Sequence, residues 1–97
     1  MNAQMLSIKH NEDMNRFEAE LNGELAKMEY MKVGNTLIFT HTEVPESFEG
    51  QGIGSKLAKT ALTYVKDNEM TAAPLCPFVK SYIDEHPEYK SLVRLGG

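Results

Sequence analysis

The sequence predicts an α+β domain in which a mostly antiparallel sheet is followed by two main helices. In the first half of the chain, apolar and polar residues alternate, which is typical of half-buried strands. From about Ile53 onward, apolar residues recur at the spacing of an amphipathic helix. The chain has 97 residues, of which 41% are hydrophobic and 25% are charged, and this composition fits a single soluble globular domain over residues 1–97.

Four strands are expected in the first half, with glycine-containing turns between them. The candidate strands are Met5–Ile8, a segment with Phe17, Ala19 and Leu21 on one face, a segment with Ala26, Met28 and Tyr30, and Thr36–Val44. Asn22-Gly23 supplies the positive φ angles of a tight hairpin turn, and Gly34-Asn35 marks another turn. The polar run His10–Asp13 ends the first strand, so His10 is expected to be solvated.

The second half is expected to continue as helix, strand and helix. The predicted elements are a helix from about Ile53, a strand at Thr71–Leu75 and a helix from Pro77 to about Glu85. Asn68 is expected to be a left-handed cap at the end of the first helix. Proline is favoured at the first helical position, and Pro87 disfavours helix at His86, which places His86 at a helix C-terminus.

The charge balance excludes several classes of partner. Fourteen acidic residues against ten basic ones give a net charge of -4, whereas nucleic-acid binders usually carry a basic stripe. We therefore expect neither nucleic acid nor a membrane as a partner, and the apolar runs are too short to span a bilayer. Without a hydrophobic signal segment at Met1–His10, the single cysteine Cys76 indicates a cytoplasmic protein. Cys76 and the three histidines lack paired-ligand spacing, so no metal site is expected.

The first candidate binding site is the loop from Glu49 to Lys56, which lies between a predicted strand and a predicted helix. A helix N-terminus offers unpaired N–H groups and partial positive charge, and glycines let a phosphate approach them closely. Lys56 can add a counter-charge. The loop matches neither the Walker pattern nor the dinucleotide-binding fingerprint. Taken alone, this segment also fits a flexible loop that merely starts a helix.

The residues around this loop carry a family resemblance. Glu43-Val44-Pro45, followed by Gly50-Gln51-Gly52-Ile53-Gly54-Ser55-Lys56-Leu57, resembles the acetyl-CoA-binding motif of the Gcn5-related N-acetyltransferases (GNAT). That motif is Gln/Arg-x-x-Gly-x-Gly/Ala, and here Glu49 stands at the Gln/Arg position, so only the backbone contacts carry over. The resemblance implies a minimal GNAT-like fold and acetyl-CoA as co-substrate. It implies these cofactor-binding residues: Thr42, Glu43, Val44, Gln51, Gly52, Ile53, Gly54, Ser55 and Lys56.

A second set of residues makes the resemblance more specific. Cys76-Pro77-Phe78 and His86-Pro87-Glu88-Tyr89 are similar to the signature of a subgroup of very small GNAT-like proteins, and the likeness extends from about Arg16 to Val93. Such proteins lack the early helices and the last hairpin of the usual fold. The residues that normally cover the acceptor are therefore missing or reduced, which leaves an amine acceptor of unknown identity.

Three residues are candidates for catalysis. Cys76 lies where a strand ends and a helix begins, where the helix dipole favours a thiolate, and the resemblance implies a position near the thioester. The alternative for Cys76 is a small buried hydrophobe. His41, expected on one strand face with Leu37 and Phe39, is either a hydrogen-bonded core residue or a base. Tyr82 is spaced as the GNAT tyrosine that protonates the leaving CoA thiolate, and its alternative is a packed aromatic ring.

The sequence thus predicts a protein that binds acetyl-CoA and transfers the acetyl group to an unidentified amine, directly or through Cys76. The alternative is a CoA-binding or protein-interaction module without catalysis. The acidic surface, the short chain and the reduced substrate cover favour this alternative more than they would for a full-length family member.

Overall fold

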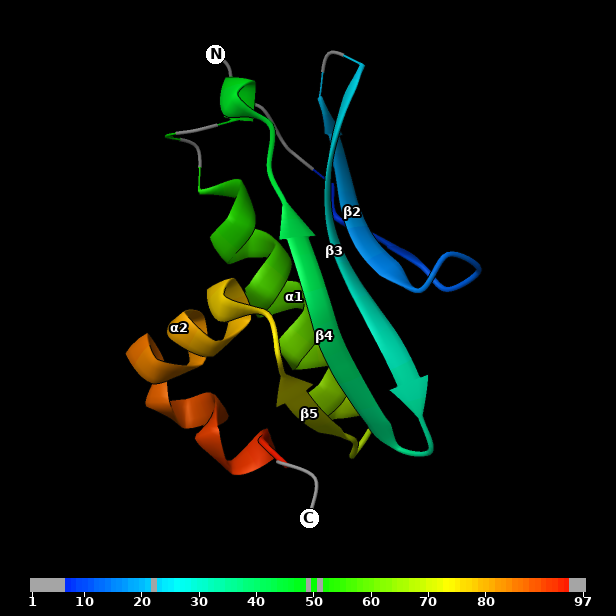
Figure 1. Ribbon diagram of the computed structural model, residues 1–97, viewed down its shortest axis with the longest axis vertical. Helices are drawn as coiled ribbons and strands as arrows, with labels where there is room; N and C mark the ends of the chain where they lie inside the picture. Colours follow the sequence, from blue (N-terminus) through cyan, green and yellow to red (C-terminus); the bar gives the residue numbers. More distant parts are fainter. Residues whose placement is uncertain (1–6, 22, 49, 51, 95–97) are drawn as a thin grey trace.

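The computed structural model describes residues 7–21, 23–48, 50 and 52–94 and confirms the predicted α+β class. A five-stranded sheet runs in the order β1-β2-β3-β4-β5, with α1 packed across one of its faces and α2 beside β5 (Figure 1). The elements are β1 Lys9–Asn11, β2 Arg16–Leu21, β3 Glu24–Val33, β4 Thr36–Glu43, η1 Glu46–Phe48, α1 Ile53–Asp67, β5 Thr71–Pro74, α2 Pro77–Glu85 and η2 Pro87–Leu92. No helix in these described ranges is long and apolar enough to cross a membrane.

The sheet is antiparallel from β1 to β4, and β5 joins β4 in parallel. Both predicted hairpins are present. Leu21 pairs with Glu24 around a turn in which Gly23 has φ +81°, and Asn22 lies outside the described residues. Val33 pairs with Thr36 around Gly34, whose φ is +59°. These left-handed φ angles explain why glycine occupies both turns.

The first strand differs from the prediction. β1 begins at Lys9, after the predicted strand Met5–Ile8, and extends into the polar run that was expected to end that strand; Met5 and Leu6 lie outside the described residues. His10 is half-buried rather than solvated, because its ring stacks on Phe17 at a centroid distance of 4.0 Å. Its Nε2 lies 2.7 Å from the Tyr30 hydroxyl oxygen. Burial lowers the pKa of His10. The His10 ring therefore attaches this short polar strand to the core.

The helix boundaries follow the sequence closely. α2 spans Pro77–Glu85 as predicted, and the N–H of His86 caps it by donating to the Ile83 carbonyl at 3.1 Å. The cap of α1 is displaced by one residue. Asn68 has φ −100° and its side-chain amide donates to the Tyr64 carbonyl at 2.8 Å, whereas Glu69 is the left-handed residue, with φ +55°. The prediction of a left-handed Asn68 is therefore wrong.

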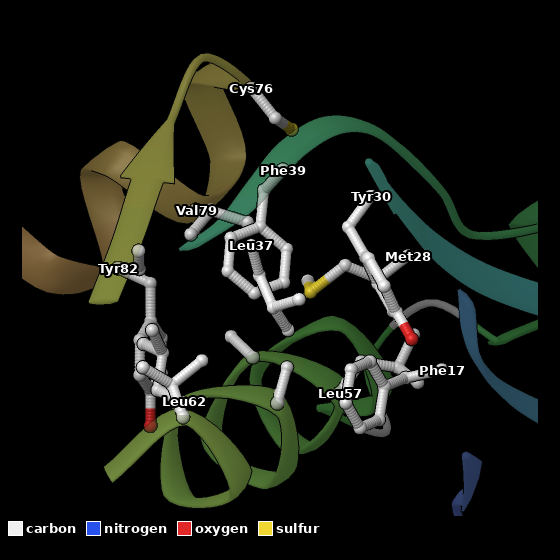
Figure 2. Close-up of a cluster of buried hydrophobic side chains, with 14 of the residues drawn as sticks. Phe17, Met28, Tyr30, Leu37, Phe39, Leu57, Leu62, Cys76, Val79 and Tyr82 are labelled. Carbon is white, nitrogen blue, oxygen red and sulfur yellow. The ribbon is translucent and has the colours of Figure 1, made fainter. Parts of the chain in front are cut away.

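The core lies between the sheet and α1 (Figure 2). Alternate residues of β2, β3 and β4 turn inward and meet the apolar stripe of α1, as their spacing predicted. The largest side chains that are almost fully buried are Phe17, Phe39, Phe48, Met28, Leu37, Ile53, Leu57, Leu62, Val65 and Val79.

Candidate active site between β4, α1 and α2

The parallel pair β4–β5 separates halfway along β4. Pairing runs from Thr36 with Thr71 to Phe39 with Pro74. The N–H groups of Leu75 and Cys76 then both donate to the Phe39 carbonyl, at 3.1 and 2.9 Å. Beyond this point, β4 and the segment that follows β5 diverge (Figure 1). In the described part of the chain, no strand lies beside this edge of β4 from Thr40 to Glu43. An open edge of this kind can pair with an extended ligand.

An extra residue in β4 reverses the direction of its later side chains. Tyr30 pairs with Phe39, but the preceding Glu29 pairs with His41, so Thr40 is the additional residue of a β-bulge. His41 therefore leaves the face of Phe39 and joins that of Glu29. The prediction that His41 shares a face with Leu37 and Phe39 is wrong, because the bulge breaks the two-residue alternation.

His41 and Glu43 instead belong to a charged cluster on the outer face of the sheet. Their side chains are 58% and 59% exposed, with His41 Nε2 3.7 Å from a Glu43 carboxylate oxygen. Lys27 lies 3.8 Å from Glu43 and 3.6 Å from Glu29. The Glu43 carboxylate thus points away from the inner face of β4, and only the backbone of Glu43 is available at the open edge of the strand. Within the described residues, no group of three or more His, Cys, Asp or Glu side chains can hold a metal ion.

Cys76 caps the N-terminal end of α2 and is only 5% exposed. Its Sγ lies 3.2 Å from the Thr42 hydroxyl oxygen, and Figure 2 shows the sulfur directed toward β4. The bulge makes this contact possible, because it turns Thr42 rather than His41 to the inner face of β4. Two residues predicted for different roles, Thr42 for cofactor binding and Cys76 for catalysis, are thus brought together.

Tyr82 lies apart from this pair. Its ring is 8% exposed and stacks on His86 at a centroid distance of 4.0 Å, with Tyr89 at 6.0 Å. In Figure 2 its hydroxyl oxygen points away from the Cys76 sulfur. Burial raises the pKa of Tyr82. Tyr82 therefore packs within an aromatic cluster, and its part in catalysis stays a prediction.

The Gly-rich turn leads directly into α1. Gly52 has φ +69° and ψ 24°, a left-handed conformation that favours glycine, and its carbonyl accepts a bond from the Lys56 N–H at 3.0 Å. The N–H groups of the first helical turn, from Ile53 to Ser55, lie at the positive end of the helix dipole. Glu49 and Gln51 lie outside the described residues. The described part of the turn therefore has the features of an anion site.

A pocket of about 210 Å³ opens at this turn. Its lining combines residues of the Gly-rich segment with apolar residues from other parts of the chain. The lining residues are Val44, Phe48, Gly50, Gly52, Ile53, Gly54, Ser55 and Phe78. Phe48 and Phe78 were not predicted for the site. Phe78 lay within the quoted Cys-Pro-Phe segment, whereas no sequence signal marked Phe48.

Residues 16–92 match the family described as GCN5-related N-acetyl-transferase, and the chain belongs to this family. It is 33% identical to Protein NATD1 of Mus musculus over 93 residues, which cover 93% of this chain and 84% of that protein. Protein NATD1 of Xenopus tropicalis is 34% identical, with 93% and 85% covered. The NMR structure of a GCN5-like protein from Staphylococcus aureus superimposes with a TM-score of 0.72 at 28% identity, and covers 95% of this chain and 91% of that one.

Proposed function

We propose that this protein binds acetyl-CoA along the open edge of β4 and transfers the acetyl group to an amine. The divergence of β4 and β5 is the observation that carries the proposal, because it leaves an unpaired strand edge between the Gly-rich turn and Cys76. The pantetheine arm of CoA is extended and contains two amides, which suit such an edge at Thr42–Val44. The diphosphate suits the N–H groups at the start of α1, with Lys56 exposed nearby. Membership of the family supports this ligand.

We propose that the acetyl group passes through Cys76. The Cys76 sulfur attacks the thioester carbonyl, the bond to the CoA sulfur breaks, and the proton that Cys76 gives up ends on the CoA thiol. The amine then attacks acetyl-Cys76 and its proton returns to the cysteine sulfur. The Thr42 hydroxyl, 3.2 Å from Sγ, orients the nucleophile. His41 on the outer face and Tyr82 within the helical cluster receive no part in this route.

Two finer assignments accompany this proposal. The Cys76-Pro77-Phe78 and His86-Pro87-Glu88-Tyr89 segments support placing the chain in a subgroup of very small family members. A single cysteine that must remain reduced to act suits the cytoplasm.

The test is to incubate the protein with acetyl-CoA, quench in acid and weigh the intact chain. One acetyl adduct that hydroxylamine removes, and that Cys76→Ala lacks, supports transfer through Cys76. Consumption of acetyl-CoA with a panel of amines measures the complete reaction. Full turnover by Cys76→Ala without any adduct would assign the chemistry to direct attack by the amine.

The burial of Cys76 favours a second function, a CoA-binding module without catalysis, because a thiol that is 5% exposed is poorly accessible. Tight binding of CoA without adduct or turnover for any amine would support that function. Absence of CoA binding would contradict both.

A further inference from the structure

Gly54 lies directly beneath the ring of Phe78. A β-carbon built on Gly54 would stand 2.7 Å from Phe78 Cζ and 3.2 and 3.3 Å from the two Cε atoms. These three are the nearest described atoms, so the Phe78 ring is the first obstacle that a side chain at Gly54 would meet. The backbone of Gly54 is not left-handed, which means that conformation does not require glycine here. The missing side chain at Gly54 instead makes room for Phe78.

The Phe78 ring completes an apolar wall beside the start of α1. Val44 follows β4, Phe48 ends η1 and Phe78 lies in the first turn of α2, so three separate segments build this wall. Phe48 is 1% exposed, whereas Phe78 is 39% exposed. Phe78 is thus the most exposed of the three and offers the most apolar surface to a ligand, with Val44 partly buried beside it. The glycines Gly50, Gly52 and Gly54 line the same pocket through their backbone.

We propose that Phe78 is the residue that makes this site prefer CoA to other diphosphates, an inference that rests on the proposed function. In CoA, the diphosphate is followed by a pantoate unit whose quaternary carbon bears two methyl groups. A diphosphate on the N–H groups of Ile53 and Gly54 brings these methyl groups against the wall of Val44, Phe48 and Phe78. A nucleoside diphosphate has no branched apolar group at that position and gains nothing from the wall.

Gly54 is then a positioning residue for Phe78. Alanine at this position displaces the ring, which is the free end of a side chain and can move outward, while the backbone of α1 stays in place. Because the Gly54 backbone is not left-handed, the obstacle to a side chain at this position is the Phe78 ring.

The experiment compares two ligands by calorimetric titration: CoA and 3′-phospho-ADP, which retains the diphosphate but lacks the pantetheine arm. Phe78→Ala should weaken CoA binding by about tenfold, the loss expected for an apolar group in a complementary pocket. Binding of 3′-phospho-ADP should stay unchanged. Leu75→Ala is the matched control, because Leu75 is an apolar residue that is 67% exposed and lines a different hollow. Thermal melts of each variant establish that it is folded.

Gly54→Ala provides the second arm. It should weaken CoA binding in the wild-type background and leave it unchanged in the Phe78→Ala background, where the obstructing ring is absent. An equal loss in both backgrounds would overturn the coupling of Gly54 to Phe78. Equal weakening of both ligands by Phe78→Ala, or of neither, would overturn the selectivity role. If the wild-type chain binds neither ligand, the proposed function itself is overturned. This outcome is distinct from the outcomes that overturn only the role of Phe78.

Discussion

The contact between His10 and Tyr30 predicts how strongly β1 is held to the core. The two polar atoms are 2.7 Å apart, Tyr30 is 6% exposed and the His10 side chain is 18% exposed. A hydrogen bond of this kind contributes about 0.5–1.5 kcal/mol net, and a buried partner left unpaired costs about 1–3 kcal/mol. Because His10 retains some access to water, Tyr30→Phe should lower the free energy of unfolding by about 1 kcal/mol, a fall in Tm of about 4–8 °C.

The same contact gives the stability a pH dependence. Burial lowers the pKa of His10 from its usual 6.5, and it outweighs the Glu12 carboxylate, which raises that pKa; the Lys32 ammonium lowers it further. The unfolded chain therefore takes up a proton at His10 at a higher pH than the folded chain does. This contribution to stability is complete above pH 6.5 and is lost as the pH falls through the folded-state pKa.

Urea unfolding followed by circular dichroism measures both effects in wild type, His10→Phe, Tyr30→Phe and the double variant. Phenylalanine at position 10 preserves the ring stack on Phe17 but cannot titrate. Between about pH 7.5 and 5.5, wild type should lose more stability than His10→Phe, and all other groups titrate equally in both. Equal losses in the two proteins would refute the assignment to His10. An unchanged stability in Tyr30→Phe would refute the energetic value of the hydrogen bond.

Three further predictions concern the site. Gly52→Ala should destabilise the chain by about 1–2 kcal/mol and Gly52→Asn by less in thermal melts, because φ +69° is left-handed and no described atom crowds a β-carbon there. Thr42→Val should slow acetylation of Cys76 by about three- to tenfold in time-resolved mass spectra, through loss of one hydrogen bond. Tyr82→Phe should leave amine acetylation unchanged within about twofold, whereas loss of a general acid would cost about 10²-fold or more.

Local signals account for the parts of the fold that were predictable. The period-two alternation of β2 and β3 and the hairpin glycines act over a few residues, and both segments have the expected faces. Pro77 and Pro87 act on the chain next to them, and α2 ends where they indicate. The position of β1 was not predicted, because His10 attaches this strand to the core by contacts with Phe17 of β2 and Tyr30 of β3. A run of polar residues in the sequence does not indicate such contacts.

In the candidate site, too, features that depend on neighbouring residues were predictable, and features that depend on strand pairing were not. The Gly-rich turn was recognisable because its glycines and the following helix are adjacent in the chain. His41 was assigned to the inner face by alternation, and only pairing with β3 reveals that Thr40 is an extra residue. Tyr82 follows Cys76 by six residues of helix, about 9 Å along the axis, and the sequence alone does not show which neighbours its ring packs against.

Ligand preference depends most on contacts that are distant in sequence. The pocket wall joins Val44, Phe48 and Phe78 from three segments, and the Phe78 ring lies where a side chain at Gly54 would stand. A glycine motif alone indicates only that an anion can approach a helix N-terminus, which many phosphate ligands satisfy. Discrimination between those ligands requires a protein group that contacts the part of the ligand next to the diphosphate, where CoA has its branched, apolar pantoate unit. If Phe78 is that group, exchanging it should change which diphosphate is bound and leave intact the ability to bind one.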